Sequence, residues 1–303
     1  MPRTLSYVFL FVIGLFHSLA SAQTPCQPAQ KPIVVLTFDD SVKSHFTVAR
    51  PILKEYGFGA TFFITEGFTF KTNKEAYMTW EEIKQLHDEG FEIGNHTRDH
   101  LGITDKTWTR LDEQLRGIEE QCQAYGIPKP TSFAWPGNAI SAEALPILRE
   151  HGILFARRGT QPEFSYEAGR GPVYEPGFDH PLLIPTTGDA RPNWKLDNVV
   201  EAVAKWEPGK FVVLQFHGVP EIEHPWVHTP EENFEIYMRF LKSEGCTVIA
   251  MRDLSKYVNP YCVPCDPWYG IKARQQQMVA EPEQAKTVRL RCSLPLHRRR
   301  CKP

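Results

Sequence analysis

Short hydrophobic runs recur along the chain from residue 33 to residue 258, and segments with helix signals separate them. The runs are rich in Val, Ile, Leu and Phe and alternate little between apolar and polar positions. Such runs are typical of strands that are buried on both faces of a parallel sheet. We expect eight strands, at 33–38, 59–64, 91–95, 131–135, 153–157, 181–186, 211–217 and 246–250.

Helix signals lie between these strands. Thr79-Trp80-Glu81-Glu82 is a capping box, and Gly90 is the expected stop of its helix. In Thr229-Pro230-Glu231-Glu232, proline would occupy the first helical position, and Gly245 would end that helix. A longer helix is expected over residues 105–125.

Repeated units of strand and helix form either an open doubly wound sheet or a barrel. About eight units within one domain favour an α/β barrel, and we place this domain at residues 30–258. Two of its connections, 159–180 and 186–196, are rich in Gly and Pro and are longer than ordinary connections. We therefore expect them to surround a site.

The two ends of the chain differ from this domain. At the N-terminus, Arg3 precedes an apolar stretch over residues 7–16, and Ala20-Ser21-Ala22 forms a small-residue cleavage site. This pattern predicts a signal peptide over residues 1–22 rather than a buried helix, and hence a secreted or periplasmic mature protein. At the other end, residues 259–303 are rich in Pro, Gln and Arg, which predicts an extended or disordered tail.

Seven cysteines follow the expected cleavage site. Export would allow disulfides, but an odd number leaves at least one thiol free or paired between chains. Cys262-Val263-Pro264-Cys265 has the spacing of a redox pair or of half a zinc site, and no second such motif completes a zinc site. We expect a structural disulfide there.

Composition narrows the classes of partner. The 303-residue chain is long enough for one large α/β domain. Its net charge of −2 argues against nucleic acid as a main partner, because phosphate binding usually needs a basic domain. No stretch is long enough to span a bilayer, and no protein partner can be inferred from the sequence.

Polar groups follow four of the predicted strands at their carboxyl ends. They are Asp39-Asp40, His96, Pro136-Gly137-Asn138 and His217. Catalytic residues gather at this edge in barrels and in open α/β sheets alike. Adjacent carboxylates also repel each other and shift each other's pKa. A nearby cation would offset this repulsion between Asp39 and Asp40.

A metal ion would supply that cation. His96 and His100 have the H-x3-H spacing that places two imidazoles on one face of a turn, as zinc binding requires. Together with Asp40 they would leave coordination positions open for water and substrate. Taken singly, the features have simpler explanations, because an aspartate at a strand end is often a helix cap and spaced histidines are often surface residues. His217 is the candidate general acid, because imidazole side chains generally exchange protons near neutral pH.

The chain resembles the polysaccharide deacetylase family, also called carbohydrate esterase family 4, in three motifs. They are Thr37-Phe38-Asp39-Asp40, His96-Thr97-Arg98-Asp99-His100 and Leu214-Gln215-Phe216-His217, and their order and separation match from residue 33 to about 255. The resemblance implies a distorted (β/α) barrel with seven to eight mostly parallel strands.

The resemblance also implies a set of roles. Asp40, His96 and His100 would bind a divalent metal ion, usually zinc, with cobalt, nickel or manganese as alternatives. Asp39 would be the general base that activates the attacking water, and His217 would protonate the departing amine. The backbone N–H groups near Gly137 or Asn138 would stabilise the oxyanion.

Two motifs depart from the family pattern. The third motif usually begins with an arginine that orients the catalytic aspartate, but Ala134 occupies that position in Phe133-Ala134-Trp135-Pro136-Gly137-Asn138. Arg98, Arg157 and Arg158 are the candidates to replace it. The fourth motif is only weakly recognisable over residues 188–194, and it contributes Trp194 as a substrate-binding candidate beside Trp135.

The segment after His217 contains a second H-x3-H pair, His224 and His228. It could form another metal site, but Pro225 between the histidines disfavours a helix. We prefer a loop over the cleft in which Trp226 stacks on a sugar, with a plain surface loop as the alternative.

Together these features predict a secreted, metal-dependent hydrolase that removes acetyl groups from an N-acetylated or O-acetylated glycan. One alternative is a hydrolase of small cyclic imides or ureides, since relatives with this fold cleave such compounds. Another is an inactive glycan-binding module. The presence of all five candidate metal-binding and catalytic residues argues against it; they are Asp39, Asp40, His96, His100 and His217.

Overall fold

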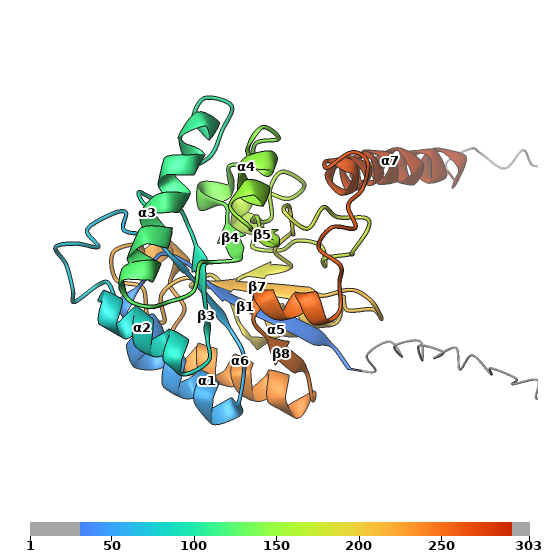
Figure 1. Ribbon diagram of the computed structural model, residues 1–303. Helices are drawn as coiled ribbons and strands as arrows, with labels where there is room; N and C mark the ends of the chain where they lie inside the picture. The colour runs from blue at the N-terminus through green and yellow to red at the C-terminus, as the bar shows by residue number, and fades with distance from the viewer. Residues whose placement is uncertain (1–30, 293–303) are drawn as a thin grey trace, which may run out of the picture.

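The fold is a distorted α/β barrel built around a parallel sheet (Figure 1). The computed structural model describes residues 31–292, with side chains described up to residue 280. The strands are β1 Ile33–Phe38, β2 Thr61–Ile64, β3 Glu92–Asn95, β4 Ser132–Ala134, β5 Phe155–Arg157, β6 Gly188–Asp189, β7 Val212–Phe216 and β8 Thr247–Ile249. The helices are α1 Arg50–Tyr56, α2 Trp80–Asp88, α3 Leu111–Ala124, α4 Ala144–Glu150, α5 Leu196–Val203, α6 Glu231–Ser243 and α7 Tyr269–Cys292. The predicted fold class is confirmed.

The strands follow the order β5-β4-β3-β2-β1-β7-β6, and all of these pairs are parallel. Strand β1 is central, because it pairs with β7 along its length and with β8 and β2 at its first and last residues. The carboxyl ends of β1, β3, β4 and β7 therefore meet at one edge of the sheet.

The prediction of a strand at 181–186 was wrong. Ile184 makes only an isolated bridge to Arg157 of β5, and the two-residue strand β6 lies further along the chain. The segment changes partners, since Ile184 N donates to Ala156 O at 2.9 Å and Thr187 N donates to Val213 O at 2.8 Å. The segment therefore bridges β5 and β7, but it forms no continuous ladder of hydrogen bonds with either strand.

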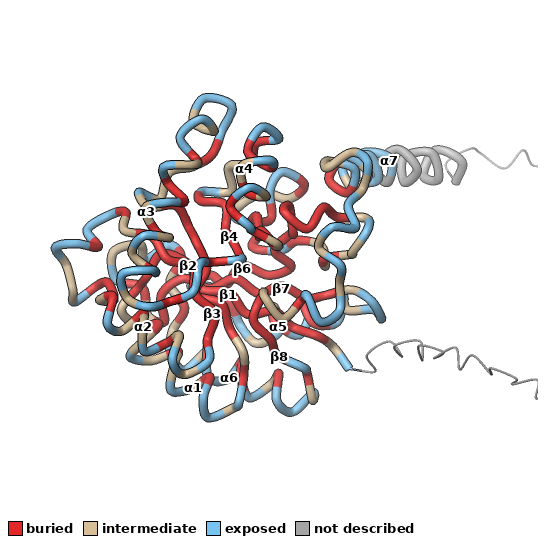
Figure 2. Tube along the Cα trace, viewed as in Figure 1, coloured by how far each residue is buried: buried red, intermediate tan, exposed pale blue. Residues whose placement is uncertain are grey.

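Side chains of β1 alternate between two apolar cores. Val34 and Leu36 belong to the core between the sheet and the helices α1, α2, α5 and α6, and Val35 belongs to the barrel interior. Figure 2 shows the strands buried and the helices exposed on their outer sides. Burial on both sides explains why the strand sequences show so little alternation.

The helix signals were partly right. Thr79 caps α2 through a capping box with Glu82, and Gly90 follows α2 with a φ of +97°. Pro230, however, is the residue before α6 rather than its first helical residue. The helix expected over 105–125 begins only at Leu111, after a short 3-10 turn.

The prediction of an extended or disordered tail was wrong for residues 269–292, which form α7. Residues 272–279 are mostly Lys, Ala, Arg, Gln and Met, which favour a helix without any amphipathic pattern. Arg274 fastens the helix to the domain, because its guanidinium contacts both carboxylate oxygens of Asp179 at 2.6 and 2.7 Å. Figure 1 shows α7 at the side of the domain.

The disulfide expected between Cys262 and Cys265 is absent, and both thiols are exposed and free. Cys122 and Cys246 are buried thiols, and burial raises their pKa values to about 12 and about 11. The expected signal peptide, residues 1–22, lies outside the described residues. None of the helices within residues 31–292 combines the length and apolar character needed to cross a membrane.

Acid is expected to destabilise the fold through His45, which is fully buried and whose Nε2 lies 3.0 Å from the carbonyl oxygen of His217. Burial lowers the pKa of His45 to about 4. Between about pH 6.5 and pH 4 the unfolded chain then binds a proton that the folded protein does not, so stability falls as the pH falls. One such group contributes at most about 1.4 kcal/mol per pH unit.

The variant His45→Gln can still donate a hydrogen bond but does not titrate. Urea unfolding of both proteins at several pH values measures the difference, and we expect a flatter dependence for the variant. Equal slopes would show that His45 does not contribute to acid sensitivity.

Candidate metal and catalytic site

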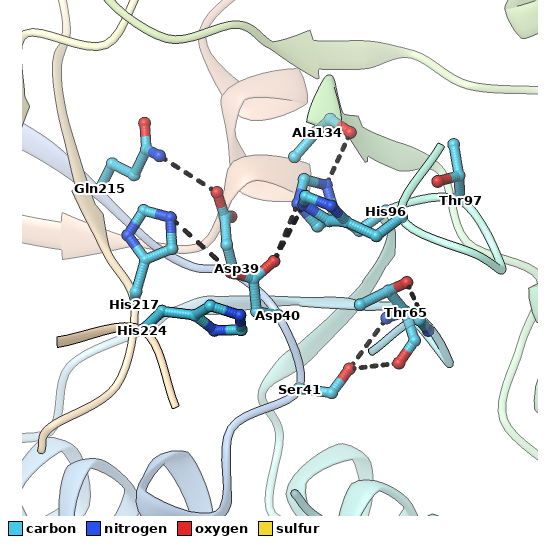
Figure 3. A network of polar contacts seen from close by, with 12 residues as sticks. Asp39, Asp40, Ser41, Thr65, His96, Thr97, Ala134, Gln215, His217 and His224 are labelled. Carbon is cyan, nitrogen blue, oxygen red and sulfur yellow. Dashed lines mark hydrogen bonds and ion pairs between the residues drawn. The ribbon is translucent and has the colours of Figure 1, made fainter. Parts of the chain in front are cut away.

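The turn after β1 places two carboxylates at the centre of the sheet edge (Figure 3). Asp40 and Ser41 have φ values of +76° and +60°, a conformation that non-glycine residues seldom adopt. The Ser41 hydroxyl fixes the turn, because it donates to the carbonyl oxygen of Thr65 and accepts from its N–H, both at 2.8 Å. Backbone strain of this kind is characteristic of functional sites.

Asp40 lies between two histidines. Its Oδ1 atom is 3.4 Å from His96 Nε2 and 3.2 Å from His100 Nε2. His96 donates from Nδ1 to the carbonyl oxygen of Ala134 at 2.8 Å, so in the neutral imidazole the lone pair lies on Nε2, the atom nearer to Asp40. The three side chains form the one group of potential metal ligands found within the described residues, with ligand atoms inside 4.8 Å of one another.

These residues fit a divalent metal ion. Asp40 Oδ1 is buried and has no hydrogen-bond partner, although buried carboxylate oxygens are normally satisfied. Burial would raise the pKa of Asp40, but the side-chain contacts of His100 and His96 and the charges of His100 and His217 outweigh it and hold the pKa well below its usual value. One carboxylate and two imidazoles form a common ligand set for zinc and similar ions, and they leave further positions open.

Asp39 is held by an arginine from β5. Arg157 Nη2 lies 2.5 Å from Asp39 Oδ2, and Gln215 Nε2 donates to the same oxygen at 3.2 Å. Arg157 also donates to the side-chain oxygen of Gln215, so the three residues form a buried network. Asp39 Oδ1 has no hydrogen-bond partner and remains available for another group.

Arg157 is therefore the arginine that replaces the one missing at position 134. The other two candidates are engaged elsewhere, since Arg98 pairs with Asp99 and Arg158 pairs with Glu163. Ala134 and Arg157 are direct partners in the register of β4 and β5. The guanidinium thus comes from the neighbouring strand.

His217 lies across the site from the other histidines. Its Nε2 is 3.9 Å from Asp40 Oδ2, and its Nδ1 is 4.0 Å from Asp189 Oδ1. Asp189 forms an ion pair with Arg191, and burial raises its pKa. Asp189 was not predicted as a site residue, although it belongs to the weak fourth motif.

A cavity of about 290 Å³ joins these groups. The predicted residues that line it are Asp39, Asp40, His96, His100, Trp135, Gly137, Asn138, His217 and Trp226. The lining also includes Phe68, Tyr166, Gln215, His224 and Val227, which were not predicted as site residues. Of these, His224 carried a signal through its spacing from His228, and Gln215 belongs to the motif that ends in His217.

The prediction that Trp194 binds substrate was wrong. Trp194 is only 4% exposed and belongs to the core beneath the sheet, near Gly188 and Leu214. Its ring lies against Gly188 of β6, and the residue precedes α5 by two positions. Trp135 reaches the cavity but is 2% exposed, and its indole N–H donates to Leu182 O at 2.9 Å, so little of its face is free for a sugar.

His224 and His228 form no second metal group among residues 31–280. His228 Nδ1 accepts the backbone N–H of Glu221 at 3.1 Å. His224 and Trp226 line the cavity, as expected for a loop over the cleft, and Trp226 is 60% exposed.

Comparison with known proteins gives a matching family model and several curated relatives. Residues 27–156 match the family model described as polysaccharide deacetylase, and this segment contains Asp39, Asp40, His96 and His100. The peptidoglycan-N-acetylglucosamine deacetylase of Bacillus cereus is 28% identical over 126 residues, which are 41% of this chain and 55% of that protein. The match thus spans about half the length of this curated relative.

Solved structures share the fold. A family 4 acetyl xylan esterase from Clostridium thermocellum, in complex with a cobalt ion, has a TM-score of 0.52 at 19% identity, over 77% of this chain and 97% of that chain. A family 4 pseudoenzyme from Bacillus anthracis has a TM-score of 0.51 at 18% identity, over 78% of this chain and 68% of that chain. At such identities the likeness concerns the fold alone.

Proposed function

Because this chain belongs to the polysaccharide deacetylase family, we propose that it is a metal-dependent hydrolase that removes acetyl groups from an N-acetylated or O-acetylated glycan. One observation carries the proposal. Asp40 Oδ1 is buried without a hydrogen-bond partner between two histidine Nε2 atoms, while the adjacent Asp39 is fixed separately by Arg157. The two carboxylates are thereby equipped for different tasks.

Asp40, His96 and His100 would hold the metal ion, with zinc as the first candidate and cobalt, nickel or manganese as alternatives. A bound divalent ion would polarise the acetyl carbonyl and make water more acidic. The protein's own residues provide the remaining steps.

Asp39 would take the proton of the attacking water through Oδ1, since Oδ2 is occupied by Arg157 and Gln215. As the water oxygen bonds to the carbonyl carbon, negative charge develops on the carbonyl oxygen, and backbone N–H groups near Gly137 or Asn138 would stabilise it. The carbon–nitrogen bond then breaks, His217 donates a proton to the leaving nitrogen, and acetate is released.

Metal removal provides the main test. Treatment with a chelator is expected to lower acetate release from N-acetylated oligosaccharides at least about a hundredfold, because the carbonyl loses its Lewis acid. Adding zinc to the dialysed protein should restore it, and protein dialysed without chelator is the control. Acetate release that persists after complete metal removal would contradict the proposal.

A panel of substrates separates this proposal from its alternatives. Acetate release from chitooligosaccharides, together with no turnover of cyclic imides, supports deacetylation. The reverse result would favour a hydrolase of small amides. Binding of oligosaccharides without turnover of any compound would favour an inactive module. We also propose export of the mature protein, which N-terminal sequencing of the secreted form would test.

A further inference from the structure

The loop between β7 and α6 presents a second histidine to the cavity. His224 lies on this loop beyond His217, and both side chains line the cavity (Figure 3). The His224 ring packs between Phe68 and Trp226, with ring centroids 4.6 and 5.2 Å away. No step of the proposed reaction uses His224.

A buried glutamate lies next to the His224 ring. The Glu221 side chain is 2% exposed, and its Oε1 atom lies 3.7 Å from His224 Nδ1. Glu221 Oε2 and His224 Nδ1 have no hydrogen-bond partner, although both are buried. Nδ1 is the ring nitrogen on the side of Glu221, so Nε2 is the ring nitrogen left to face a ligand.

The loop is held in place from inside. Glu221 Oε1 accepts the backbone N–H groups of Glu223 and His224 at 3.0 and 3.2 Å. Ser44 Oγ donates to Pro220 O at 2.8 Å and accepts from the N–H of Val219 at 2.7 Å. His224 is therefore positioned before any ligand binds.

The loop is also hydrogen-bonded to the segment that follows β2. The carboxylate of Glu223 accepts hydrogen bonds from Thr69, Asn73 and Tyr77 at 2.9, 2.7 and 2.8 Å. These bonds fix Trp226 beside His224 at the mouth of the cavity, with 60% of Trp226 exposed. An exposed aromatic face next to a fixed polar group suits a ligand that is apolar on one face and polar at its edge.

We propose that His224 is a substrate-binding residue that hydrogen-bonds a ring hydroxyl of a pyranose sugar stacked on Trp226, and that Glu221 is its positioning residue. This inference deepens the proposed function and rests on it for the choice of a glycan. An imidazole suits this place, because it can bond a hydroxyl without adding negative charge beside Asp39 and Asp40.

Equilibrium binding tests the inference without turnover. The probe is the N-acetylglucosamine tetramer, titrated into metal-loaded protein that carries Asp39→Asn. His224→Ala is expected to weaken the Kd about tenfold, the effect of one lost hydrogen bond to substrate. His224→Gln, which keeps a donor, should recover part of the loss. His87→Ala, on α2, is the matched control and should bind like the parent.

A double-mutant cycle tests the role of Glu221. Glu221→Gln is expected to weaken binding about threefold when His224 is present and to have no effect in the His224→Ala background. Equal effects in both backgrounds would show that Glu221 only maintains the loop. Unchanged tetramer binding in His224→Ala, or no tetramer binding to the parent, would overturn the inference.

A separate assay tests the proposed function independently of sugar binding. Hydrolysis of 4-nitrophenyl acetate, which contains no sugar, is measured with Asp39 intact on the parent protein, and the control His87→Ala is expected to retain it within about twofold. A protein that hydrolyses no acetyl compound but binds the tetramer through His224 would refute the proposed function and support the inference. A parent protein that hydrolyses acetyl compounds, with tetramer binding that is equal with and without the His224 side chain, would overturn the inference alone.

Discussion

Replacing Asp39 with asparagine is expected to abolish acetate release while the protein keeps its divalent metal ion. Asparagine has the same shape and can still accept a hydrogen bond from Arg157, but it cannot take a proton from water. Loss of a general base typically lowers kcat about a hundredfold to ten-thousandfold. Acetate release and the metal content after dialysis measure the two effects in one preparation.

Asp40→Asn is the matched comparison, because it changes the neighbouring residue in the same way. This variant is expected to lose both metal and activity, since an amide oxygen is a weaker ligand than a carboxylate between His96 and His100. Near-normal turnover in Asp39→Asn would refute its role as base. A normal metal content in Asp40→Asn would refute the ligand set.

The site could be predicted from the sequence as far as strand ends determine it. Asp39-Asp40, His96 and His217 follow separate strands, and parallel strands bring their carboxyl ends to one edge. Their apolar runs are distinctive, because the strands are buried on both faces. The prediction that these residues meet therefore required the strands and their direction, but no detailed packing.

Packing decided the features that the sequence could not predict. Three arginines were candidates to hold Asp39, and only the register of β4 and β5 selects Arg157. Likewise, the sequence of the segment containing Trp194 gives no indication that this ring packs into the core. Glu221 carries no sequence signal, because its importance comes from the burial of its side chain within the loop after β7.

Loss of Arg157 is expected to damage stability and activity together. Arg157→Ala would leave Asp39 buried near Asp40 without its cation, and breaking one partner of a buried ion pair typically costs about 3–5 kcal/mol. Urea unfolding measures the loss of stability, and acetate release measures the loss of activity. Arg239→Ala is the control, because its ion pair with Glu235 lies on the exposed side of α6.

A second substitution separates the charge from the position that supplies it. Ala134 is the register partner of Arg157, and parallel partners project their side chains to the same face. In the double variant Ala134→Arg, Arg157→Ala, the guanidinium moves one strand over, to the position that the common family pattern uses. We expect it to regain at least about tenfold of the activity lost in Arg157→Ala, which corresponds to about 1.4 kcal/mol. If stability returns without activity, the ion pair serves only the fold; if neither returns, the neighbouring strand cannot replace the contact that Arg157 makes with Asp39.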